Sequence, residues 1–199
     1  SIKAAANAGA SAVKFQTFNA DEFMSKGKTK YSYKTASGKK TENMYQMFKR
    51  LELPEKWYKR LISEAKRNKV KFFSSTGDEQ AAIFLNKIGV KLMKIASPDL
   101  TNYPLLECVA KLGNKTIIST GMGDEKEIDI AVKIFKKYKT PISLLHCVSM
   151  YPTPKTNTNL LRIIKLREKY KDVEIGYSDH SLGYKSCVIA AALGATVIE

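Results

Sequence analysis

The sequence is poor in the features that mark secreted, membrane-spanning and disordered proteins. Its three cysteines are scattered among 199 residues without a CxxC pair, which argues against a disulfide framework or a zinc knuckle. No apolar run approaches the roughly 18–20 residues of a membrane span, and no charged-then-apolar signal segment opens the chain. Hydrophobic residues make up 44% of the chain, enough for a buried core. These observations predict a globular cytoplasmic protein.

Acidic residues are also scarce. The chain has 19 Asp plus Glu against 34 Lys plus Arg, a formal net charge of +15, and such an excess suggests anionic partners. It is almost entirely lysine, whereas proteins that read nucleic acids use arginine and interleaved aromatics. Two interpretations stay open at this point: a lysine-rich solvated surface, or a basic module that binds anions or nucleic acid.

Seven short apolar runs alternate with stretches of helical periodicity. One such stretch follows Asp78 and ends at Gly89, another begins at Pro104 and ends at Gly113, and a third follows Asp124. Repeats of about 20–30 residues predict βαβ units and a parallel sheet within a single α/β domain over residues 1–199. The predicted strands are 12–15, 70–73, 92–96, 116–118, 142–145, 173–177 and 195–198.

One connection is unusually long. Residues 19–43 carry six lysines and two glycines, and a loop of this length in a compact domain is either functional or a mobile solvated segment. We expect a loop here, either solvated or acting as a substrate lid.

Polar side chains recur where the predicted strands end. GxGxxG and P-loop motifs are lacking, which disfavours a nucleotide-binding doubly wound sheet. When every strand end carries polar residues, a (β/α)8 barrel is favoured, because its strands share one functional mouth. The strand ends are 14–17, 74–76, 94–97, 119–121, 146–149 and 178–180, and the seventh run stops at Glu199.

A lysine inside an apolar strand is the most informative residue, because an unpaired buried ammonium is costly. Lys94 and the strand-end serines can surround a small dianion such as a phosphorylated carboxylate, and the "STG" turn at 119–121 leaves backbone N–H groups near a helix start. Each serine alone can equally be a strand-end cap; together they predict an anion site. These serines are Ser75, Ser97, Ser119 and Ser178.

The chain has two histidines, both near strand ends. His180, in "IGYSDHS", is either a metal ligand on the rim of a site or a structural cap. His146, in "LLHCV", is either buried and hydrogen-bonded or catalytic, and the adjacent Cys147 is expected to pack in the core.

Taken in order, these segments resemble the sialic acid synthase family, which includes N-acetylneuraminate and legionaminic acid synthases. The resemblance implies a (β/α)8 TIM barrel whose strands 2 to 8 lie here, with the first strand and a C-terminal antifreeze-like domain outside residues 1–199. "HCVSMYPTP" and "GYSDHSLG" are the most specific of the segments that carry it, which also include "GASAVKFQTF", "KVKFFSSTGDEQ", "LMKIASPDLTNYPLL" and "TIISTGMG".

The resemblance further implies a transferase of polysaccharide biosynthesis. Such enzymes condense phosphoenolpyruvate with an N-acylated mannosamine-type aldose to give a nine-carbon 2-keto acid and phosphate. They use a divalent metal, Mn2+ or Mg2+, as a Lewis acid, and they act as homodimers, with no nucleic acid or membrane as partner.

Residue by residue, the resemblance places substrates and metal around the mouth. Lys94, Ser119 and Ser178 match binders of the phosphate, with Ser75 and Ser97 near its polar groups. Lys14 and Gln16 match residues that face the substrates, and Gln16 is expected to be catalytic. Tyr151 matches a catalytic residue at the same mouth and Glu199 a catalytic acid near the sugar, and His180 matches one of two metal histidines.

Two departures from the family pattern matter. Ser149 stands where many members have asparagine, which exchanges an amide contact to the anion for a hydroxyl. The chain also starts after the family's first-strand glutamate and ends before a "KHF" motif that holds the second metal histidine. We therefore expect the piece alone to be inactive. A barrel that makes seven- or eight-carbon keto acids, and the basic binding module, are the rival functions.

Overall fold

The structure is a computed structural model that describes residues 1–35 and 38–199. The chain divides into two compact units: unit 1, residues 1–81, and unit 2, residues 82–199. Each unit has its own parallel strands. Nowhere in the described ranges is a helix both long and apolar enough to cross a membrane.

Unit 1 is built around two parallel strands. β1 (Ala12–Thr17) pairs with β4 (Lys71–Thr76), and Gln16 lies opposite Ser75 in this register. Apolar side chains from the strands and helices, among them Val13, Ala65 and Val70, form its core. The helices of unit 1 are α1 (Ile2–Asn7), α2 (Ala20–Phe23), α3 (Met44–Leu51) and α4 (Glu55–Arg67).

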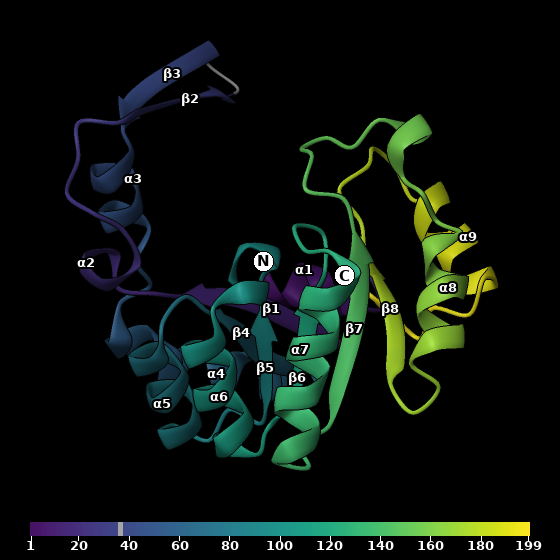
Figure 1. Cartoon of the computed structure of the whole chain (residues 1–199). Helices are drawn as coiled ribbons and strands as arrows, with labels where there is room; N and C mark the ends of the chain where they lie inside the picture. Colours follow the sequence, from purple (N-terminus) through teal and green to yellow (C-terminus); the bar gives the residue numbers. More distant parts are fainter. Residues whose placement is uncertain (36–37) are drawn as a thin grey trace. The chain divides into compact units, whose positions relative to one another are not determined.

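The lysine-rich segment 19–43 is not the loop that the sequence predicts. It contains α2 and an antiparallel hairpin of β2 (Lys30–Thr35) and β3 (Gly38–Asn43), while residues 36–37 of the predicted loop lie outside the described part. Within unit 1 the hairpin and α3 extend away from β1 and β4 (Figure 1). The Tyr31 and Tyr33 rings stack on β2 with centroids 6.0 Å apart, a local contact in a hairpin whose residues are mostly exposed.

Unit 2 has parallel strands that follow each other in chain order, from β5 to β9. Helices α6 and α7 lie side by side along β5, β6 and β7 (Figure 1). The strands are β5 (Leu92–Ile95), β6 (Lys115–Ser119), β7 (Ile142–Cys147), β8 (Glu174–Ser178) and β9 (Val197–Ile198). The helices are α5 (Glu79–Lys87), whose first turn belongs to unit 1, η1 (Ser97–Thr101), α6 (Tyr103–Leu112), α7 (Glu125–Lys137), η2 (Lys155–Asn157), α8 (Arg162–Lys169) and α9 (Lys185–Ala192).

Local sequence signals set the bounds of these helices. Asp124 and Glu127 form a reciprocal capping box at the start of α7, and Gly113 ends α6 with a left-handed φ of 73°. Apolar side chains of α6, α7 and β7 are fully buried, among them Leu106, Phe135 and Leu144. Each such side chain contributes about 1.5–3 kcal/mol through burial.

The predicted architecture is confirmed. All seven apolar runs are parallel strands, and the periodic stretches between them are helices. This is the alternating parallel α/β arrangement from which (β/α)8 barrels are made.

Candidate active site

The polar strand ends of unit 2 lie at one edge of its sheet. The strands are parallel and in register, so that Ser119 pairs with Leu145 and Cys147 with Ser178. The backbone of Glu199 bonds to Tyr177 and Asp179 beside the end of β8. Ser119, Ser178 and Glu199 therefore lie at the same edge, as predicted for a shared mouth.

Lys94 is the centre of this edge. Its side chain is only 3% exposed, and its Nζ donates to Ser119 Oγ at 2.6 Å and to the Ile95 carbonyl at 3.0 Å. The Glu199 carboxylate lies 3.6 Å from the same Nζ. A buried ammonium needs such partners. The result is a fixed positive charge at the carboxyl ends of β5 and β6, suited to a small anion.

Ser97 joins two further strand ends. Its Oγ accepts the Gly121 N–H at 3.0 Å and lies 3.0 Å from Cys147 Sγ. A side chain does not fit at position 121, because a Cβ there would lie 2.5 Å from Cys147 Sγ and 2.9 Å from Ser149 Oγ. The glycine thus brings Ser97, Cys147 and Ser149 together.

This cluster changes two predictions. The N–H groups of the "STG" turn are not open to an anion: Thr120 N–H donates to the Leu145 carbonyl and Gly121 N–H to Ser97. Cys147 is buried as expected, but it also takes part in the hydrogen bonding around Ser97. The sequence carries no signal for either contact, because the partners are far apart along the chain.

His180 and Tyr151 lie against each other, with ring centroids 4.2 Å apart. His180 Nδ1 lies 2.9 Å from the Val148 carbonyl, which can only accept, so Nδ1 carries the proton. In the neutral ring this leaves the lone pair on Nε2. That tautomer, held by a carbonyl, is typical of histidine metal ligands.

The carboxylate of the neighbouring Asp179 accepts hydrogen bonds from three groups of the protein. These groups are the Tyr177 hydroxyl, the Ser181 N–H and the Cys187 thiol. Burial alone would raise the pKa of Asp179, but these bonds lower it, whereas burial and the Asp179 contact raise the pKa of Cys187 to about 11. Asp179 is therefore not placed as a metal ligand.

The described residues do not form a complete metal centre. Within 1–35 and 38–199, no three His, Cys, Asp or Glu side chains come together to hold an ion. His180 fits a single ligand position, through the lone pair of Nε2.

Three predicted residues belong to unit 1. Lys14 and Gln16 are exposed on one face of β1, and Ser75, opposite Gln16 on β4, is 8% exposed. Gln16 and Ser75 occupy the carboxyl-terminal halves of their strands, whereas Lys14 is the third of the six residues of β1. Their roles, like those of the unit 2 residues, stay predictions.

Asp99, which the sequence did not single out, lies in η1 close to Lys94. Burial raises the pKa of Asp99 from 3.8 to about 6, although a hydrogen bond with Asn102 and the charge of Lys94 act to lower it. Ionising this carboxyl therefore opposes folding. The penalty is absent below pH 4, grows between about pH 4 and pH 6, and is complete above about pH 6.

We expect Asp99→Asn to stabilise the protein at pH 7.5 and to have little effect at pH 4. The gain at pH 7.5 should be about 1 kcal/mol, since one pKa unit corresponds to about 1.4 kcal/mol and the group is only partly buried. Urea unfolding at both pH values measures it. Asp172→Asn, at an exposed aspartate, is the matched control, and an equal effect of the two substitutions would contradict the prediction.

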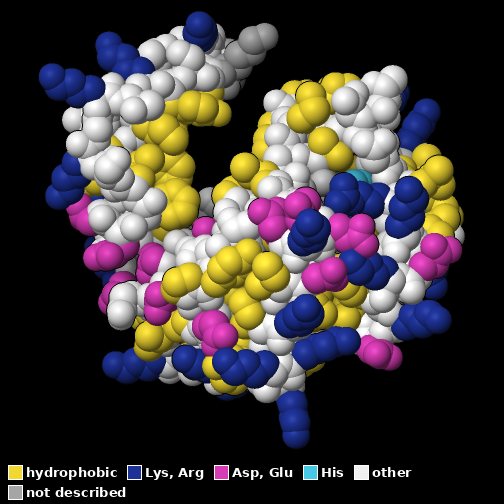
Figure 2. All heavy atoms as spheres, in the orientation of Figure 1, with side chains coloured by type: hydrophobic (Ala, Val, Ile, Leu, Met, Phe, Trp, Pro, Cys, Tyr) yellow, Lys and Arg dark blue, Asp and Glu magenta, His cyan; other side chains and the backbone are white. Residues whose placement is uncertain are grey.

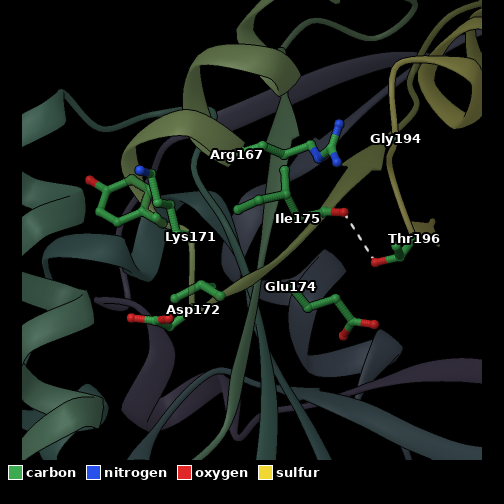
Figure 3. A pocket seen from close by; sticks show the side chains of 9 residues that line it. Arg167, Lys171, Asp172, Glu174, Ile175, Gly194 and Thr196 are labelled. Atoms are coloured by element: carbon green, nitrogen blue, oxygen red, sulfur yellow. Dashed lines mark hydrogen bonds between the residues drawn. The ribbon is translucent and has the colours of Figure 1, made fainter.

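A surface pocket lies at the other edge of the unit 2 sheet (Figure 3). It is lined by residues that precede or begin β8 and by residues that precede β9, including Arg167, Glu174 and Thr196. Two of its charged groups are engaged in the fold: Glu174 pairs with Lys115, and Arg167 donates to the Leu193 carbonyl.

Several known proteins with similar sequences are named as synthases of legionaminic or pseudaminic acid. The chain is 39% identical over its whole length to N,N'-diacetyllegionaminic acid synthase of Campylobacter jejuni, of which it covers 60%. It is 36% identical, again over its whole length, to pseudaminic acid synthase of the same species, of which it covers 58%.

A solved structure shows the same fold. The N-acetylneuraminic acid synthetase of Leptospira borgpetersenii, crystallised with citrate, matches the whole chain with a TM-score of 0.89 and 38% identity. The chain covers 64% of that protein, so it spans under two thirds of these relatives. The predicted fold, part of a synthase (β/α)8 barrel, is confirmed. The NeuB family profile matches residues 1–199, and the chain belongs to the NeuB family.

Proposed function

We propose that the complete protein condenses phosphoenolpyruvate with an N-acylated mannosamine-type aldose, giving a nine-carbon 2-keto acid and phosphate. The observation that carries this proposal is the buried Lys94 ammonium, with Ser119 and Glu199 around it, at the carboxyl edge of unit 2. Membership of the NeuB family and the named synthases among its relatives support it. The citrate of the Leptospira relative is, like phosphoenolpyruvate, a small polyanion.

In this proposal the chain supplies charge and position. Lys94, Ser119 and Ser178 bind the phosphate, and Ser75, Ser97 and Ser149 contact the other polar groups of phosphoenolpyruvate. Lys14, Gln16, Tyr151 and Glu199 face the substrates. Holding two anionic or polar reactants in line removes much of the entropic barrier, and fixed charges stabilise the developing ones.

The bond changes are balanced without a redox step. C3 of phosphoenolpyruvate attacks the aldehyde carbon of the open-chain sugar, and the positive charge that develops at C2 is captured by water. The tetrahedral intermediate then expels phosphate and leaves the 2-keto acid. We propose His180 as one ligand of a divalent ion, Mn2+ or Mg2+. The homodimer, the antifreeze-like domain and the cytoplasmic location stay predictions.

The basic module is the less favoured function. Lysine and arginine side chains are spread over the visible face and interleaved with Asp and Glu (Figure 2), and several lysines are paired with carboxylates, for example Lys169 with Glu125 and Asp129. A nucleic-acid site requires basic residues gathered on one face. The buried Lys94, in contrast, is out of reach of a phosphate backbone.

A substrate panel tests the proposed function. The complete protein is incubated with phosphoenolpyruvate, Mn2+ and either an N-acylated mannosamine-type aldose or a four- or five-carbon aldose phosphate, and phosphate release and product mass are followed. We expect release and a nine-carbon acid with the first class alone. Turnover of an aldose phosphate would instead favour the seven- or eight-carbon synthases, and tight oligonucleotide binding without turnover would favour the basic module.

A further inference from the structure

The segment that carries Ser149 and Tyr151 is a loop, residues 148–158, between β7 and α8, which we name the 148–158 loop. Tyr151 is 76% exposed. Apart from the contact of its ring with His180, its position therefore depends on the backbone that carries it. Both histidines of the chain bind that backbone, one at each end.

The first end is held from the β8 side. His180 donates Nδ1–H to the Val148 carbonyl, and the Thr153 N–H donates to the His180 carbonyl at 2.8 Å. Within the loop, Thr153 Oγ1 donates to the Met150 carbonyl at 2.8 Å. These contacts fix the first half of the loop against the strand that carries Ser178.

The far end is held by His146. This side chain, 3% exposed at the end of β7, has Nε2 2.8 Å from the Thr158 carbonyl. A carbonyl only accepts, so Nε2 carries the proton. Burial lowers the pKa of His146 and the Arg162 charge adds to this, although the bond to Thr158 opposes it. The neutral ring therefore remains a donor to the loop.

We propose that His146 is a positioning residue: it ties the far end of the 148–158 loop to β7 and so holds Ser149 and Tyr151 in place for the substrates. That Ser149 and Tyr151 contact the substrates rests on the proposed function. That His146 holds the loop rests on its hydrogen bond to Thr158. Of the two roles that the sequence left open for His146, the structure shows the buried, hydrogen-bonded one, and the proposal adds what that hydrogen bond does for the loop.

Three variants of the complete protein test it. His146→Leu removes the donor at similar volume. His146→Gln returns an N–H donor close to the position of Nε2. Thr140→Val is the matched control, because Thr140 is also buried and donates to a backbone carbonyl, that of Ala110 at 2.6 Å, outside the loop. His146→Leu and Thr140→Val each lose one buried hydrogen bond, so they should lower the melting temperature by similar amounts.

The first readout is hydrogen exchange at the loop amides of Met150, Thr153 and Asn157, which needs no activity. We expect at least about tenfold faster exchange in His146→Leu and near-normal exchange in His146→Gln and Thr140→Val. If His146→Leu does not fold, His146→Asn, whose amide is too short to reach Thr158, takes its place. The proposal would be overturned if the loop amides exchanged as slowly in the histidine variant as in the Thr140→Val control.

The second readout separates this inference from the proposed function. In an active protein, His146→Leu should lower kcat/KM by about tenfold to a hundredfold through misplacement of Ser149 and Tyr151, with rescue in His146→Gln and no change in Thr140→Val. Unchanged kinetics beside faster exchange would also overturn the positioning role. If the wild-type protein makes no product, the proposed function fails. Hydrogen exchange at the loop amides and the affinity for phosphoenolpyruvate then still test whether His146 positions the loop.

Discussion

Replacing Lys94 by methionine is expected to weaken the binding of phosphoenolpyruvate to the complete protein roughly ten- to 150-fold. Methionine keeps most of the volume of the side chain but removes the ammonium, and a charge-assisted bond is worth about 1.5–3 kcal/mol. The Glu199 carboxylate, 3.6 Å from Nζ in the wild type, would then face the incoming dianion without a balancing charge. Isothermal titration calorimetry measures the change in Kd.

The same substitution at a second lysine provides the control. Lys115 begins β6 at the opposite edge of the sheet, where it pairs with the half-buried Glu174 carboxylate at 2.7 Å. Lys115→Met should leave the affinity for phosphoenolpyruvate unchanged. An unaltered Kd in Lys94→Met, with a circular dichroism spectrum like that of the wild type, would remove Lys94 from the anion site.

The second large effect is expected at His180. His180→Ala should reduce turnover with Mn2+ by at least about a hundredfold if the ring binds the catalytic ion. The melting temperature should fall only slightly, because the ring lies at a strand end and not in the core. Steady-state turnover and the Mn2+ content of the purified protein are the measurements.

His180→Asn distinguishes a metal ligand from a structural cap. The asparagine amide can donate to the Val148 carbonyl as Nδ1 does, but it offers nothing in place of Nε2. A ligand role predicts that both variants lose Mn2+ and turnover. If His180→Asn restores turnover, the ring serves the loop alone and the metal assignment is wrong.

Much of the fold could be predicted because its signals are local. Apolar runs and caps such as Asp124 determine strands and helices over short stretches, and parallel strands must bring their carboxyl ends to one edge. Lys94 stood out for the same reason, as a charge within an otherwise apolar strand.

Two kinds of feature could not be predicted from the sequence: contacts between residues far apart along the chain, and strands that bury neither face. The bond from Gly121 to Ser97 and the approach of Cys147 join separate strands, and no periodicity reports them. The pKa of Asp99 likewise follows from burial by later elements. The hairpin of β2 and β3 was missed because its residues are mostly exposed, so alternation with a core gives no signal.

That hairpin has a consequence for self-association. Each of its two strands has a single neighbour in the described chain, so each offers an outer row of backbone donors and acceptors to which a strand of another molecule can add. Exposed Lys30, Lys39 and Lys40 make such addition bring like charges together. The lysine excess of this segment then opposes the growth of a β-sheet between molecules through charge repulsion. This role in colloidal stability needs no anionic ligand.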